Sequence, residues 1–172
     1  LSATGNDSSV YFMAAEIARQ CKRLGIHINF APDADVNSNP LNPIIGSRAF
    51  SDDATSVTTR ALLYMNGLQD NHVLACAKHF PGHGDTDTDS HLALPVIHKN
   101  ISQLDSLELI PFRKLIREGV GSIMVAHIFM PAIDPEANAA STLSKIIVSD
   151  LLKDKMKFSG LELLLNRSMP NF

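Results

Sequence analysis

Apolar residues recur at two different spacings along this chain. Four segments carry an apolar residue every three or four positions, which predicts amphipathic helices. They span about residues 7–24, 52–69, 103–118 and 144–155. Short continuous apolar runs between them predict buried strands, and strands that alternate with helices indicate βαβ units and a parallel sheet. These runs cover residues 26–31, 73–77 and 122–126, and a further strand is expected to begin at Leu161.

Local signals indicate where the helices begin and end. Asn6 or Asp7 is expected to cap the first helix, and Gly25 is expected to stop it. Ser102 is expected to cap the third helix. Pro111 is expected to kink or divide that helix, because proline removes a backbone hydrogen-bond donor.

The loops after the strands favour a barrel enzyme. Each predicted strand ends in polar residues and a long loop, and TIM barrels build their active face from such loops. No GxGxxG or GxxxxGK(S/T) phosphate-binding motif follows any strand. A complete barrel needs about 250 residues, whereas this chain has 172. We therefore expect one α/β domain over residues 1–172, a partial TIM (β/α)8-type barrel made of middle βα units only.

The composition excludes several classes of function. With 45% hydrophobic and 19% charged residues, the chain fits an ordinary globular protein and not a disordered one. Its net charge of -3 gives no footprint for nucleic acid. No apolar run approaches the ~20 residues of a membrane span. Cys21 and Cys76 are expected to be buried free thiols, and no CxxC pair indicates a zinc or redox site.

The stretch Lys78–Pro95, KHFPGHGDTDTDSHLALP, has the composition of a loop that carries chemistry. It holds three histidines, three aspartates and a lysine directly after an apolar run. Asp89 and His91 lie two residues apart, so the carboxylate can hydrogen-bond the imidazole and orient it as a general acid and base. The spacing alone fits a solvated turn equally well.

Metal binding by this loop is not expected. Its alternating aspartates begin like a calcium-binding EF-hand, but the sixth position is Ser90 where glycine is needed. The twelfth position is Val96 where a bidentate glutamate is needed. The histidines of the loop match no familiar zinc-ligand spacing.

Three basic residues are further candidates. Lys78 and His79 follow an apolar strand directly, and the lysine either pairs with a carboxylate or reaches the hydroxyl groups of a ligand. Arg48 precedes the second helix. It either donates paired hydrogen bonds to an oxygen-rich ligand or is a surface arginine.

Two acidic residues and a histidine also follow predicted strands. Asp33 and Asp35 are expected to pack against the turn at residues 37–39. His127 either faces the active rim of the barrel or is a hydrogen-bonded structural histidine.

The motif KHFPGHGDTDTDSH resembles the signature loop of glycoside hydrolase family 3, in its bacterial β-N-acetylglucosaminidase (NagZ-type) branch. The resemblance extends from about Gly25 to Gly160 through a series of ordered blocks. These are NFAP, DVNSNP, NPIIGSRAF, GLQ, SLELIPF, VGSIMVAHI, STLS and FSGL.

The resemblance implies a TIM-barrel glycosidase of carbohydrate metabolism, without metal or cofactor. Such an enzyme removes β-linked N-acetylglucosamine from peptidoglycan fragments during cell-wall turnover, with retention of configuration. By the same resemblance, His91 is the general acid/base and Asp89 its partner. Lys78, His79 and Arg48 hold the sugar. A location in the cytoplasm is favoured, with export to the periplasm as the alternative.

The chain departs from the family at both ends. The family's nucleophilic aspartate lies in a stretch like GLxxTDALxM, and the matching position here is Leu165. Glu162 lies about one strand-length too early to replace it, and the family's first βα unit has no counterpart. We therefore expect an inactive fragment that is truncated at both ends. The alternative is a non-catalytic sugar-binding or interaction fragment on the same scaffold.

Overall fold

The computed structural model describes residues 6–86, 94–135 and 140–164. Within these ranges helices and strands alternate, as the apolar pattern predicts. The helices are α1 (Ser8–Arg23), the 3-10 turn η2 (Gly46–Arg48), α2 (Ala54–Gln69), α3 (Ile101–Ser106), α4 (Leu109–Arg117) and the π-helix η3 (Ile146–Lys155). The strands are β1 (Ile28–Asn29), β2 (Leu74–Phe80), β3 (Ser122–Val125) and β4 (Leu161–Leu164).

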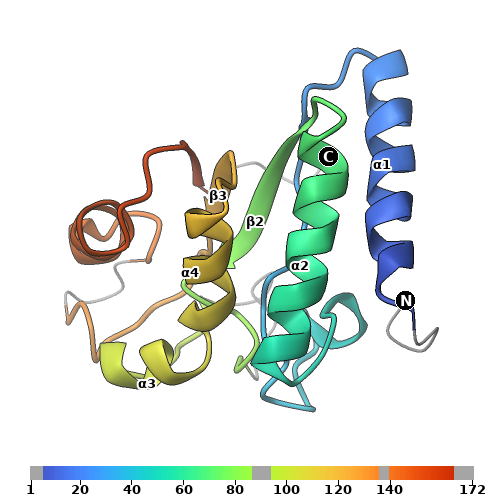
Figure 1. Cartoon of the computed structure of the whole chain (residues 1–172). Coiled ribbons are helices and arrows are strands. Elements are labelled where there is room, and N and C mark those ends of the chain that lie inside the picture. Colours follow the sequence, from blue (N-terminus) through green and yellow to red (C-terminus); the bar gives the residue numbers. More distant parts are fainter. Residues whose placement is uncertain (1–5, 87–93, 136–139, 165–172) are drawn as a thin grey trace, which may run out of the picture.

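The strands form a parallel sheet in the order β1-β2-β3-β4. Figure 1 shows α2 and α4 in front of β2 and β3, with α1 beside α2. Neighbouring strands that follow the chain order, with their helices on one face, form the repeating βα unit of a TIM barrel. The predicted parallel α/β arrangement is therefore confirmed.

β2 and β3 turn one face toward the helices. Ala77 and Phe80 of β2 and Ile123 of β3 are fully buried in the main apolar core. The Phe80 ring meets Phe112 of α4 edge to face, with 5.4 Å between the ring centroids. Lys78, one residue after Ala77, lies on the opposite face of β2, which becomes the inner face of a barrel. The register of β2 against β3 shifts between Lys78 and Phe80, and this irregularity returns Phe80 to the helix side.

The third predicted helix is divided, but not at Pro111. α3 ends at Ser106 and α4 begins at Leu109, so that Pro111 lies in the first turn of α4, where no backbone donor is needed. The predicted cap Ser102 is also wrong. Asn100 caps α3, because its side chain accepts the Gln103 N–H while the Gln103 side chain accepts the Asn100 N–H.

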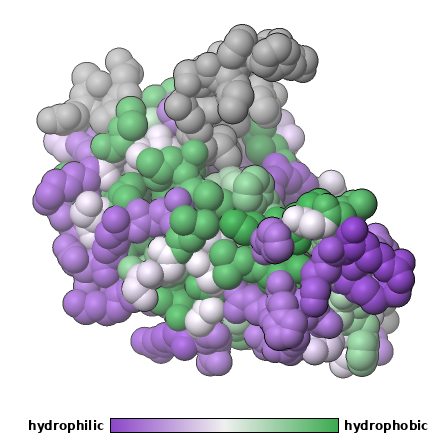
Figure 2. Space-filling model, turned by 90° about the horizontal axis from the view of Figure 1, so that it is seen from above, coloured by the Kyte–Doolittle hydropathy of each residue, from purple (hydrophilic) through white to green (hydrophobic). Residues whose placement is uncertain are grey.

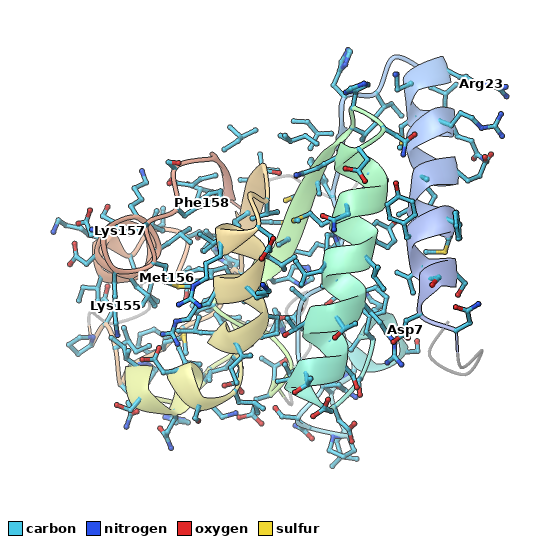
Figure 3. The ribbon with its side chains drawn as sticks, viewed as in Figure 1. Asp7, Arg23, Lys155, Met156, Lys157 and Phe158 are labelled. Atoms are coloured by element: carbon cyan, nitrogen blue, oxygen red, sulfur yellow. The ribbon has the colours of Figure 1, made fainter. Side chains whose placement is uncertain are left out.

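α1 is held against α2. Asp7 stands at the N-cap of α1 without a side-chain cap bond, and the preceding Asn6 side chain accepts the Ser8 N–H at 3.1 Å. The Asp7 side chain pairs instead with Arg60 of α2 across 2.9 Å; Figure 3 labels Asp7 at the start of α1. Gly67 lets the two helices approach closely, because a Cβ there would lie 2.5 Å from the Tyr11 carbonyl oxygen.

The first two strands differ in length from the prediction. β1 is only two residues long, yet the chain after it keeps pairing with β2: the Cys76 N–H donates to the Ala31 carbonyl at 2.8 Å and the Lys78 N–H to the Pro32 carbonyl at 3.1 Å. β2 continues to Phe80, so that Lys78 lies within the strand rather than after it.

The end of the sheet at which the strands begin carries exposed apolar side chains, among them Leu24, Ile26 and Leu161. Figure 2 views the molecule from above and shows apolar residues across its middle with polar residues around them. Both cysteines are free, with Cys76 buried and Cys21 partly buried. None of the helices in the described ranges combines the length and apolarity needed to cross a bilayer.

Candidate active site

Polar residues gather at the carboxyl ends of β1 and β2. Asp33 lies opposite Lys78 in a parallel bridge that extends the pairing of the two strands. Arg48 of η2 brings its guanidinium Nη2 to 3.8 Å from the Asp33 Oδ2. His79 follows Lys78 on β2. Arg48, Lys78 and His79 thus lie at the carboxyl ends of the strands, where barrel enzymes place their active sites.

Asp35 holds His79 and the loop after β2. This fully buried carboxylate contacts His79 through Oδ2, which lies 2.7 Å from the ring Nδ1 and 3.2 Å from the backbone N. Its Oδ1 accepts the His83 N–H at 2.6 Å. The expectation that Asp35 packs against the turn at residues 37–39 is wrong, because two histidines occupy both of its oxygens.

His79 is held in one protonation state. Burial lowers the pKa of His79 to about 4, so that the ring is neutral near pH 7. A neutral imidazole has one N–H, and the Asp35 oxygen beside Nδ1 keeps the proton on that nitrogen. Nε2 is then a hydrogen-bond acceptor.

Asp33 is less well satisfied than Asp35. Its side chain is only 10% exposed, and its Oδ1 accepts the Asp35 N–H at 3.1 Å. Its Oδ2 is buried and has no hydrogen-bond partner. Burial, and after it the negative charge of Asp35, raise the pKa of Asp33 to about 7.

Lys78 and Arg48 supply positive charge beside these carboxylates. Burial lowers the pKa of Lys78, and the positive charge of Arg48 lowers it as well. Within the described ranges, no hydrogen bond or ion pair involves the Lys78 ammonium. The Arg48 side chain is 44% exposed, and its Nη1 donates to the Ile44 carbonyl at 3.4 Å.

The loop after β2 is anchored as far as Thr86. Asn42 donates to the His83 carbonyl at 2.8 Å and to Thr86 Oγ1 at 3.2 Å. Gly84 is required in this loop, because a Cβ there would lie 1.7 Å from the Val36 carbonyl oxygen. Lys99 pairs with Asp85 across 2.9 Å. Sequence reasoning missed Asn42 and Thr86, because no spacing rule links residues so far apart in the chain.

Three predicted positions lie outside the described residues. These are Asp89 and His91, the predicted acid/base pair, and Leu165, the position predicted to match the family's nucleophile. His127 lies in the described part, with its ring Nδ1 3.1 Å from Thr142 Oγ1. This contact agrees with the structural alternative for His127.

One group of side chains has the spacing of a metal site but a poor donor set. Asp33, Asp35 and His79 bring ligand atoms within 4.8 Å of one another. However, both Asp35 oxygens and the His79 Nδ1 are already hydrogen-bonded to each other or to the loop. Arg48 and Lys78 add positive charge beside the group, which disfavours a further cation. The arrangement fits a polar, uncharged ligand better.

Sequence comparisons identify relatives of known class. The family model described as the glycosyl hydrolase family 3 N terminal domain matches residues 1–163. Beta-hexosaminidase A of Pseudoalteromonas piscicida is 39% identical over 158 residues, which cover 86% of this chain and 26% of the relative. A beta-hexosaminidase of Neisseria meningitidis is 34% identical over 144 residues, which cover 84% of this chain and 39% of the relative.

Solved structures resemble this fold closely. A glycoside hydrolase family 3 β-N-acetylglucosaminidase from Paenibacillus sp. str. FPU-7 superposes with a TM-score of 0.91 at 41% identity, covering 95% of this chain and 31% of that one. NagZ from Neisseria gonorrhoeae, in complex with N-trifluoroacetyl-D-glucosamine, gives 0.88 at 29% identity, covering 96% of this chain and 48% of that one. The chain therefore spans about a quarter to a half of the length of these relatives.

Proposed function

The chain belongs to glycosyl hydrolase family 3, and from this membership we propose that it forms part of a β-N-acetylglucosaminidase scaffold. Its proposed ligand is β-linked N-acetylglucosamine of peptidoglycan fragments. The observation that carries the proposal is the convergence of Arg48, Lys78 and His79 at the carboxyl edge of the sheet, with His79 fixed by the buried Asp35.

The proposed roles follow from the hydrogen-bonding capacity of each side chain. The ammonium of Lys78 and the guanidinium of Arg48 can only donate hydrogen bonds. In the proposed complex they therefore donate to oxygen atoms of the sugar. The neutral His79 offers Nε2 as an acceptor for a sugar hydroxyl group. Because Asp35 fixes the His79 ring with a 2.7 Å contact, the acceptor is oriented before the ligand arrives.

Proton transfer is proposed for the His91–Asp89 pair. In a retaining reaction a nucleophile attacks the anomeric carbon while a general acid protonates the departing oxygen. The same group then takes a proton from the water that releases the sugar. A histidine can perform both steps near neutral pH, with Asp89 orienting its ring.

The nucleophile is the missing half of this mechanism. Leu165 has no atom able to attack an anomeric carbon, and it occupies the position that matches the family's aspartate. We therefore propose that this chain does not turn over β-N-acetylglucosaminides by itself.

The test combines turnover and binding. We expect no release of chromophore from a chromogenic β-N-acetylglucosaminide. By calorimetry we expect N-acetylglucosamine to bind, with the affinity of Lys78→Ala reduced by about 10- to 100-fold, because hydrogen bonds to charged groups contribute about 1.5–3 kcal/mol. Lys22→Ala, on the exposed surface of α1, is the matched control and should bind as the wild type does.

The second candidate function is a non-catalytic sugar-binding module, which Leu165 favours. Binding that depends on Lys78 without turnover is expected of both candidates, whereas any turnover would exclude the non-catalytic module. Turnover that is abolished by His91→Ala would contradict the proposed inactivity, and absence of any binding would contradict the proposed sugar site.

A further inference from the structure

Asp33 is an unusual residue to find at this edge of the sheet. In the described ranges, the buried side-chain polar atoms without a hydrogen-bond partner are Asp33 Oδ2, Asn37 Oδ1, Ser38 Oγ and Glu108 Oε2. The Glu108 carboxylate is paired with Lys99 through its other oxygen, Oε1. Asn37 Oδ1 and Ser38 Oγ belong to uncharged side chains. Asp33 Oδ2 therefore stands out, because an unsatisfied buried acceptor costs about 1–3 kcal/mol and more when it is charged.

The unsatisfied oxygen lies among the proposed sugar-binding residues. Asp33 is paired with Lys78 in the parallel bridge, so that both residues lie at the same height near the carboxyl ends of the strands. Its Oδ2 is 3.8 Å from Arg48 Nη2, which is too far for a hydrogen bond. A hydroxyl oxygen bonded to both atoms would lie about 2.8 Å from each. Because Oδ2 is buried in the unliganded structure, the Arg48 side chain, which is 44% exposed, must shift to admit that oxygen.

We propose that Asp33 is a substrate-binding residue of this site, and that its Oδ2 accepts a hydrogen bond from a hydroxyl group of the sugar, which itself accepts one from Arg48. This inference rests on the proposed sugar-binding function. An ionised carboxylate only accepts hydrogen bonds, and a hydroxyl group both donates and accepts, so it complements the pair.

A cationic ligand fits this position less well. Arg48 lies 3.8 Å from the carboxylate, and Lys78 is the strand partner of Asp33. A metal ion or a free amino group would have to enter beside these two cations, whereas a neutral hydroxyl group meets no such repulsion. The local charges therefore select a neutral polar group.

A role in binding and a role in stability predict opposite effects of substitution. If Asp33 held the fold together, its replacement would lower both the melting temperature and the affinity. If Asp33 is kept for a ligand, removing its buried charge should leave the unliganded protein at least as stable while weakening binding. Asp33→Asn is the informative variant, because an amide oxygen can still accept the Asp35 N–H.

The first experiment measures affinity and melting temperature together at pH 7.5. Asp33→Asn and Asp33→Val should bind N-acetylglucosamine about 10- to 100-fold more weakly than the wild type. Asp33→Asn should melt at the same or a higher temperature. Asp52→Asn, an exposed aspartate outside the site, is the control and should change neither quantity.

The second experiment identifies the hydroxyl group. The 3-, 4- and 6-deoxy forms of N-acetylglucosamine are each titrated into the wild type and into Asp33→Val. One deoxy sugar should bind the wild type about 10- to 100-fold more weakly than the parent sugar, yet bind Asp33→Val as well as the parent does. Equal losses in both proteins for every deoxy sugar would overturn the inference.

The outcomes separate this inference from the function on which it rests. One outcome is that the wild type binds N-acetylglucosamine and that Lys78→Ala weakens this binding while the Asp33 variants leave it unchanged. That outcome refutes only the role of Asp33. If the wild type binds no N-acetylglucosamine, both proposals are refuted.

Discussion

At the scale of single residues, Asp33 and His79 give this site opposite responses to pH. The folded protein binds a proton on Asp33 up to about pH 7, whereas the unfolded chain releases it near pH 3.8, so this term lowers stability as the pH rises. His79 has a folded pKa of about 4 against 6.5 when unfolded, so its term raises stability with pH. The two slopes oppose each other between about pH 4 and 6.5.

Substitution of Asp33 should leave the rise of stability with pH that comes from His79. In Asp33→Asn the opposing slope is absent, so we expect little gain in stability near pH 4 and a gain of a few kcal/mol near pH 7.5, since each pKa unit corresponds to about 1.4 kcal/mol. Urea unfolding from pH 4 to 7.5 measures the difference. An equal effect at both ends of that range would contradict the shifted pKa of Asp33.

At the scale of elements, apolar periodicity located the helices and strands but not their ends. The predicted cap Ser102 and the true cap Asn100 lie two residues apart, and both residue types favour caps. The choice depends on backbone conformation: Asn100 has an extended backbone, with φ -85° and ψ 173°, and it forms reciprocal hydrogen bonds with Gln103. β1 is shorter than predicted, because the chain beyond Asn29 pairs with β2 irregularly.

Ser102, the predicted cap of α3, and Asn100, its observed cap, provide a matched pair of substitutions. Asn100→Ala should lower the free energy of unfolding by about 1 kcal/mol, because it removes the side chain that accepts the Gln103 N–H. Ser102→Ala, at an exposed position, should change it by no more than about 0.5 kcal/mol. Chemical denaturation of both variants measures the difference, and a larger loss for Ser102→Ala would contradict the observed cap.

At the scale of the whole molecule, the chain is a set of consecutive βα units, and residues from β2 and from the loop after β1 form the candidate site. Motif reasoning singled out Lys78, His79 and Arg48, because each stands in a recognisable block. It did not find the bonds from Asp35 to His79 and His83, which join positions 44 and 48 residues apart. Such contacts depend on how the chain after β1 pairs with β2, which places Asp33 opposite Lys78 and cannot be read from either segment alone.

The sheet of the described residues also has two unpaired edges, at β1 and β4. Parallel strands with free edges and exposed apolar side chains favour pairing between molecules. Leu161 on β4 is 45% exposed and lies opposite Ser122, at the edge of the sheet. We therefore expect the purified 172-residue chain to self-associate through this edge.

A charge on the edge strand should oppose that association. Leu161→Lys should shift sedimentation toward the 18.7 kDa monomer, because a lysine on an edge strand disfavours edge-to-edge pairing. Leu143→Lys is the control: Leu143 is 79% exposed but lies outside the strands, so its substitution should leave the sedimentation profile unchanged. Equal shifts in both variants would assign the association to general surface hydrophobicity, and the β4 edge would then have no special part in it.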